Sequence, residues 1–111
     1  MSTVQQWLEV ASTSALTATY TNTLRVEYEG AAVCLYLLED GSVHASQDLC
    51  THGNASLSEG YIENGAIECP LHQGTFDIVT GEALTAPCKL PLRVYHVKVE
   101  EDRIYLGGVR V

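Results

Sequence analysis

The chain has few basic residues, and none over most of its length. Six Lys and Arg stand against fourteen Asp and Glu, for a net charge of −8. No Lys or Arg falls between Val26 and Cys88, although acidic residues are frequent in that span. Nucleic-acid binding needs basic side chains that displace counterions, so this composition argues against a nucleic-acid partner. An acidic surface suits either steering onto a basic protein partner or simple solubility.

Long apolar runs are also missing. No run approaches the ~20 residues needed to cross a bilayer, so no membrane span is expected. The stretch from Met1 to Trp7 has no positive charge and no apolar h-region, which argues against a signal peptide and favours a cytoplasmic location. The length of 111 residues fits one domain, and we predict a single domain over residues 1–111.

The sequence shows little helical periodicity. Short alternating or apolar segments separated by turn signals predict an all-β sandwich or barrel. Asn64-Gly65 predicts a type I′ hairpin turn, and Asp40-Gly41 is a second hairpin signal. Residues 13–21, rich in Ser, Thr and Ala, are expected to form a loop or short turn. Strands are expected at residues 7–10, 23–28, 31–38, 43–46, 61–63, 66–68, 75–79, 92–100 and 103–106.

Two short pairs of metal-binding side chains are the strongest motif in the chain. Thiolate and imidazole are frequent metal ligands, and in a reducing compartment such pairs indicate a metal site rather than disulfides. Structural zinc usually takes C-x2-4-C with H-x3-5-H, and it remains an alternative. Mixed pairs fit better if the Cys hold one iron and the His the other, as in one Rieske-type [2Fe-2S] cluster per chain. The metal ligands are then Cys50, His52, Cys69 and His72.

The remaining Cys and His residues lack ligand spacing. Cys34 lies in an apolar strand segment, and Cys88 follows Pro87 with no His or Cys nearby. Buried Cys commonly behaves as a small hydrophobic residue, so both are expected to be structural. His44 and His96 lie in strand-like segments and are expected not to bind metal.

The ligand pairs belong to a longer set of motifs. They are Cys50–Gly53, Leu57–Tyr61, Cys69–Asp77, Thr80-Gly81 and the stretch from Ala86-Pro87 to Glu100. With these segments the chain resembles the Rieske ferredoxins of bacterial aromatic ring-hydroxylating dioxygenases, well over about residues 39–106 and loosely before. The resemblance implies a Rieske-type sandwich of short antiparallel strands, with a small cluster-binding subdomain inserted at about residues 45–88.

The resemblance also implies a function. Such proteins carry single electrons from a flavoprotein NAD(P)H-dependent ferredoxin reductase to the Rieske centre of a terminal oxygenase, in aromatic hydrocarbon catabolism. We therefore expect a soluble monomer without catalysis of its own that docks at a His52/His72 tip. Gly53 and Gly74 follow the His ligands and are expected to support the cluster, and Pro87 is expected to head a third loop that covers it. The alternative is a small Rieske-like subunit of an assimilatory nitrite reductase.

Departures from related families refine these expectations. Respiratory-type Rieske proteins join their ligand loops by a disulfide, but the corresponding positions here are Ala55 and Leu71. The Ser hydroxyl that bonds their cluster is also absent. With fewer donors to sulfur, we expect a potential near the low end of the Rieske range, roughly −150 mV rather than about +300 mV. Oxygenase subunits carry an Arg after the first His, where this chain has Gly53. They also contain a catalytic domain, for which a chain of 111 residues leaves no room.

Overall fold

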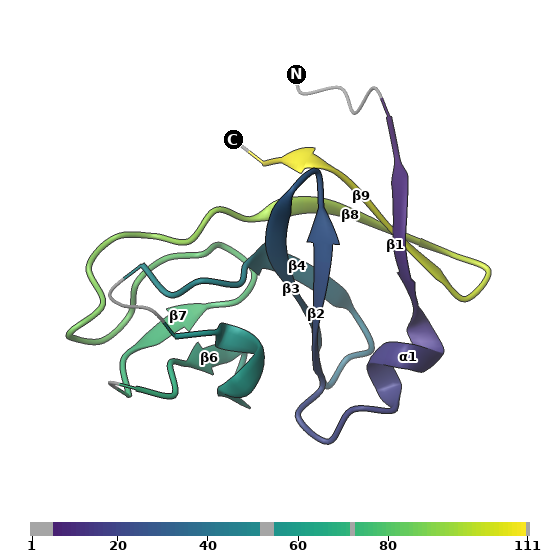
Figure 1. The fold of residues 1–111 in the computed structure, drawn as a ribbon. Helices are drawn as coiled ribbons and strands as arrows, with labels where there is room; N and C mark the ends of the chain where they lie inside the picture. The colour runs from purple at the N-terminus through teal and green to yellow at the C-terminus, as the bar shows by residue number, and fades with distance from the viewer. Residues whose placement is uncertain (1–5, 52–54, 72, 111) are drawn as a thin grey trace.

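The computed structural model describes residues 6–51, 55–71 and 73–110. This part of the chain forms three antiparallel three-stranded sheets and one short α-helix, which confirms the predicted all-β class (Figure 1). The sheets have the strand orders β1-β9-β8, β2-β3-β4 and β5-β6-β7. The elements are β1 (Leu8–Ser12), α1 (Thr13–Thr17), β2 (Thr23–Tyr28), β3 (Ala31–Leu37), β4 (Val43–Gln47), the 3-10 turn η1 (Leu57–Glu59), β5 (Tyr61–Glu63), β6 (Ala66–Glu68), β7 (Thr75–Asp77), β8 (Tyr95–Glu100) and β9 (Arg103–Val109).

Strand β3 is shared by two hydrophobic cores. Its residues from Val33 to Tyr36 are all buried, as expected for an apolar strand covered on both faces. Because side chains alternate along a strand, Val33 and Leu35 enter one core with residues of β9, while Cys34 and Tyr36 enter the other. That second core contains Cys50 and Cys69, so β3 connects the framework sheets to the predicted metal centre.

The small β5-β6-β7 sheet lies between β4 and β8 in the sequence, where the inserted subdomain was expected. Asn64 and Gly65 join β5 to β6 with φ angles of 53° and 78°, as the predicted type I′ turn requires. In Figure 1 this sheet and η1 lie on the opposite side of β2–β4 from the β8–β9 hairpin. Among the described residues, no helix is long and apolar enough to span a bilayer.

The structure differs from the sequence expectation near the N-terminus. Residues 13–17 form α1 instead of a loop, because the Ser12 side chain caps the helix by accepting from the Ala15 amide. Leu16 of this helix is completely buried in the framework core. Burial of one leucine thus helps to hold a turn of helix that its Thr- and Ser-rich sequence only weakly favours.

Several strand boundaries also differ from the expected ones, most clearly those of β7, β8 and β9. Strand β7 ends at Asp77, whose carboxylate accepts from the amides of Val79 and Thr80 and so closes a turn. Strand β8 begins at Tyr95 rather than at residue 92. Strand β9 continues to Val109 beyond the expected residue 106, because Val109 still pairs with Tyr95.

Candidate metal centre

The first ligand loop follows β4 and is closed by its own backbone. Leu49 and Ser56 form an isolated antiparallel bridge, and the Cys50 amide donates to the Ala55 carbonyl at 2.9 Å. Cys50 is only 2% exposed. The bridge therefore fixes both ends of a short loop whose first ligand points into the core.

The second ligand loop follows β6 and has similar backbone support. The Cys69 amide donates to the Gly74 carbonyl at 2.8 Å, and the Gln73 amide donates back to the Cys69 carbonyl at 3.1 Å. Gln73 adopts a φ of 59°, which lets the chain reverse within this loop. Cys69 is fully buried, so the two predicted thiolate ligands come from separate loops into one core.

The two predicted His ligands lie outside the described residues, as does Gly53. Among residues 6–51, 55–71 and 73–110, no group of three or more His, Cys, Asp or Glu is placed to hold a metal ion. The assignments of His52, His72 and Gly53 thus stay predictions. None of the four cysteines, all of which lie in the described part of the chain, forms a disulfide, and Ala55 and Leu71 offer no thiol for a bridge between the loops.

A third loop packs against the second at Gly74. A Cβ added to Gly74 would lie 2.4 Å from the Cys88 sulfur and 3.2 Å from Cδ of Pro87. Such approach is possible only without a side chain, so Gly74 is required by packing as well as by its place in the motif. Pro87 therefore lies beside Gly74, and its role in covering a cluster stays a prediction.

Side-chain hydrogen bonds tie this third loop to both ligand loops. The Thr85 hydroxyl accepts from the Thr75 amide at 2.9 Å, directly after the second ligand loop. The Thr51 hydroxyl, between the first two predicted ligands, donates to the Leu90 carbonyl at 2.8 Å. Three loops that are distant in sequence thus share one set of contacts around Cys50 and Cys69.

Cys88 is closer to this centre than the sequence indicated. It is buried in the same core as Cys50 and Cys69. Burial, followed by the neighbouring thiols of Cys50 and Cys69, raises the pKa of Cys88 to about 11. Sequence spacing could not reveal this position, because the third loop approaches the site only through the fold.

Asp48 is a second residue that the sequence did not single out. Its carboxylate is nearly buried and accepts from the Ser58 amide at 3.0 Å and from the Ser56 hydroxyl. Arg25 approaches it at 3.8 Å from the solvent side. These contacts fasten the start of the first ligand loop to its end, so Asp48 positions the loop that carries Cys50.

Cys34 and His44 also lack ligand spacing, and their surroundings suit structural roles. Cys34 is completely buried on β3, and burial raises the pKa of its thiol far above the usual range. His44 is half-buried on β4, where a ring nitrogen lies 2.9 Å from the Ser42 hydroxyl and burial lowers its pKa. The expectation that these two residues are structural fits their surroundings.

The donor set around this centre fits a cluster with two sulfur ligands. Cys50 and Cys69 lie in one buried core and form no disulfide, and each stands shortly before a predicted His ligand in the sequence. The adjoining core is otherwise apolar, with Leu57, Ile67, Phe76 and Ile78. Such surroundings limit water access on the sulfur side of a cluster.

Comparison with known proteins agrees with this geometry. The model of the Rieske [2Fe-2S] domain family matches residues 6–96. The ferredoxin component of a naphthalene 1,2-dioxygenase system from Pseudomonas putida is 43% identical over 91% of this chain and 94% of its own. The ferredoxin-containing complex of carbazole 1,9a-dioxygenase has a chain with 39% identity and a TM-score of 0.83, over 96% of this chain and 98% of that chain.

A more distant structure relates to the nitrite reductase alternative. A protein assigned as an NADH-dependent nitrite reductase small subunit from Mycobacterium tuberculosis shares 25% identity and a TM-score of 0.81, covering 98% of each chain. The fold is common to both groups, but identity is clearly higher to the dioxygenase ferredoxins, and the family match excludes a structural zinc module. The chain belongs to the Rieske [2Fe-2S] domain family and is similar in sequence to the ferredoxin components of aromatic dioxygenase systems.

Proposed function

We propose that this protein carries single electrons from an NAD(P)H-dependent flavoprotein reductase to the Rieske centre of a terminal aromatic ring-hydroxylating oxygenase. The observation that carries the proposal is the meeting of Cys50 and Cys69 in one core, on two loops that each lead to a His. The cluster supplies a reversible one-electron couple when it is bound. The chain itself has no catalytic role, and residues 1–111 act as one domain.

In this proposal Cys50 and Cys69 hold one iron, and His52 and His72 hold the other. Gly74 supports the site because it leaves room for the third loop. A Cβ added at this position would lie 2.4 Å from the Cys88 sulfur. Gly53 and Pro87 are its remaining supporting residues. Neutral imidazoles leave the oxidised site less negative than four thiolates would, so electron uptake is easier than in an all-Cys centre.

Exposed leucines around the ligand loops support docking at the same end of the molecule. Leu49 precedes Cys50, Leu71 lies between Cys69 and His72, and the Leu90 carbonyl accepts from Thr51. Their side chains are 53%, 60% and 65% exposed, respectively. We call these three residues the leucine collar. Exposed apolar side chains of this kind are suited to a transient protein contact around the His52/His72 tip.

The nature of the partners follows from the relatives. The carbazole 1,9a-dioxygenase structure is described as a complex of an oxygenase with its ferredoxin, and we infer a comparable oxygenase partner here. A reductase must supply the electron, and we place the protein in the cytoplasm as a monomer. The aromatic substrate is chosen by the oxygenase and not by this chain.

Reconstitution tests this function directly. Adding the purified protein to the reductase and oxygenase of a naphthalene dioxygenase system should restore NADH-dependent product formation, with no product when any component is omitted. The His72→Cys variant should lose the cluster or shift its potential downward, because a thiolate adds negative charge at that iron. Absence of coupled turnover with every aromatic oxygenase tried, or an unchanged centre in the variant, would contradict the proposal.

A further inference from the structure

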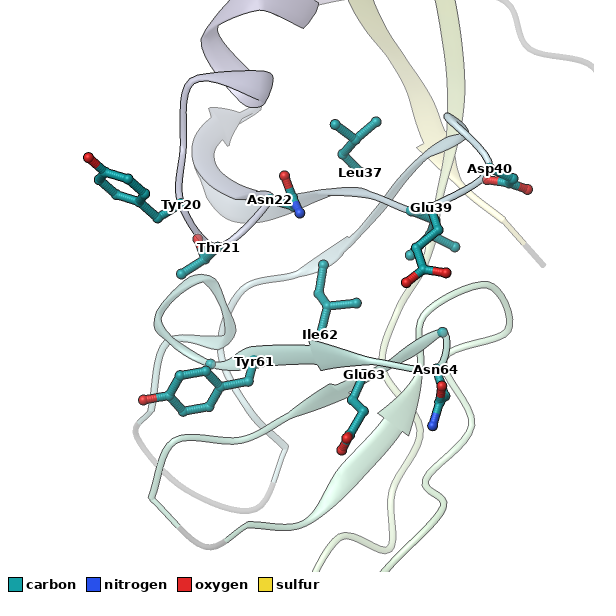
Figure 2. A pocket seen from close by; sticks show the side chains of 13 residues that line it. Tyr20, Thr21, Asn22, Leu37, Glu39, Asp40, Tyr61, Ile62, Glu63 and Asn64 are labelled. Atoms are coloured by element: carbon teal, nitrogen blue, oxygen red, sulfur yellow. The ribbon is translucent and has the colours of Figure 1, made fainter.

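Three thiols meet in the core beneath the ligand loops. Cys50, Cys69 and Cys88 are all buried and belong to one cluster of packed side chains. Figure 2 shows a groove of about 810 Å³ between the β2-β3-β4 and β5-β6-β7 sheets, and none of these three cysteines is among its lining residues. The third thiol is thus an internal neighbour of the two predicted ligands.

Gly74 determines where the Cys88 sulfur lies. A Cβ added to Gly74 would be 2.4 Å from this sulfur, so the missing side chain leaves the space that the sulfur fills. The Cys88 amide donates to the Thr85 carbonyl at 3.1 Å, which holds the backbone behind the thiol. From this position the Cys88 side chain hydrogen-bonds to that of Cys50 and lies near Cys69.

The backbone amides of the three cysteines have carbonyl acceptors. The Cys50 amide donates to Ala55 and the Cys69 amide donates to Gly74, as the Cys88 amide does to Thr85. These bonds keep the loops in shape. The Cys88 thiol is a donor of a different kind, because a thiol buried in apolar surroundings keeps its proton and can offer it to a neighbouring sulfur.

We propose that Cys88 is a positioning residue for the metal centre, and that its thiol donates a hydrogen bond to the sulfur of Cys50. The bond holds the Cys50 side chain in place for metal binding and draws on the negative charge of its thiolate. Reduction adds one negative charge to a Rieske centre, so a donor to a ligand sulfur favours the reduced state and raises the potential. This inference rests on the proposed function for the ligand role of Cys50.

A purely space-filling role for Cys88 predicts a shift of the opposite sign. If the sulfur only filled the core, its removal would leave room for water beside the centre. Water stabilises the more negative reduced state, so the potential would rise. Loss of a hydrogen-bond donor lowers the potential instead. The direction of the shift therefore separates the two roles.

Redox titration of Cys88 variants, followed by EPR, tests the bond. Cys88→Ala should lower the equilibrium constant for electron uptake about three- to tenfold, which is about 28–59 mV for one electron. Cys88→Val fills the site without a donor and should show the same fall. Cys88→Ser keeps a donor and should recover most of the loss.

Cys34→Ala is the matched control. Cys34 is a buried thiol of the same core, but its thiol donates to the Leu35 carbonyl at 3.6 Å. Removing it should change the constant for electron uptake by less than about twofold.

Resonance Raman spectroscopy gives a readout of the proton itself. Transfer of the wild-type protein to D2O should shift the iron–sulfur stretching bands, because an exchangeable proton is bound to a ligand sulfur. The shift should be smaller in Cys88→Ala and Cys88→Val and should return in Cys88→Ser.

An unchanged or raised potential in both donor-free variants would overturn the inference. So would a potential of Cys88→Ser as low as that of Cys88→Val, or an equal fall in Cys34→Ala. A wild-type protein that binds no [2Fe-2S] cluster would refute the proposed function together with this inference. A loaded wild-type protein whose potential matches those of the donor-free variants would refute the role of Cys88 alone.

Discussion

At the residue scale, side-chain packing restricts which amino acids fit at this centre, in addition to the chemistry of the metal ligands. Gly74 belongs to the Cys69–Asp77 motif, yet the structure gives it a packing reason: the Cys88 sulfur occupies the space of its missing side chain. Cys88 in turn is an unremarkable cysteine in sequence and a neighbour of both ligand thiols in the fold. The two residues should therefore respond to mutation as a pair.

Gly74→Ala should destabilise the protein by about 1–3 kcal/mol, the usual cost of overpacking, and reduce cluster content. The double variant with Cys88→Ala should recover much of that loss, since the next nearest atoms, Cδ of Pro87 and the residue-88 amide nitrogen, lie 3.2 and 3.3 Å from the new methyl group. Denaturant unfolding and the iron and sulfide content of purified protein measure both effects. Additive losses in the double variant would refute the contact.

At the scale of elements, the β5–β6 hairpin connects the two ligand loops. Its turn at Asn64-Gly65 sends the chain back, so that η1 and β5 lead out of the first loop and β6 leads into the second. The third loop is fastened to β7 by the Thr75 and Thr85 hydrogen bonds. Cluster retention should then depend on a loop that supplies no ligand.

Thr85→Val should remove the acceptor for the Thr75 amide while keeping side-chain shape. We expect a loss of about 1 kcal/mol in unfolding free energy and faster bleaching of the cluster by a chelator. Thr80→Val is the matched control, because the Thr80 hydroxyl accepts from the nearby Glu82 amide, within its own turn. If both variants bleach alike, the third loop does not protect the centre.

Much of this arrangement could be predicted from sequence. Turn residues such as Asn64-Gly65 and the alternation in 23–28 indicate strands by local rules, and β2 begins and ends where expected. Cys50 and Cys69 are predicted as ligands by their motif, and the structure places both in one core. Helix α1, Asp48 and the position of Cys88 were missed, because each depends on a side-chain contact or on burial that no local sequence pattern signals.

At the scale of the molecule, the chain combines a negative overall charge with exposed apolar side chains beside the ligand loops. The chain carries a net charge of −8, while the leucine collar provides exposed apolar surface beside the ligand loops. Long-range attraction to a basic partner and short-range apolar contact can thus act in sequence during a transient encounter.

The central claim is that the chain holds one low-potential, one-electron Rieske centre. An equilibrium redox titration of the purified protein, followed by EPR, tests it most directly. The account predicts uptake of one electron per chain, a Rieske-type signal in the reduced state, and a midpoint near the low end of the family range, roughly −150 mV. A reduced state without such a signal, or a midpoint near about +300 mV, would contradict it.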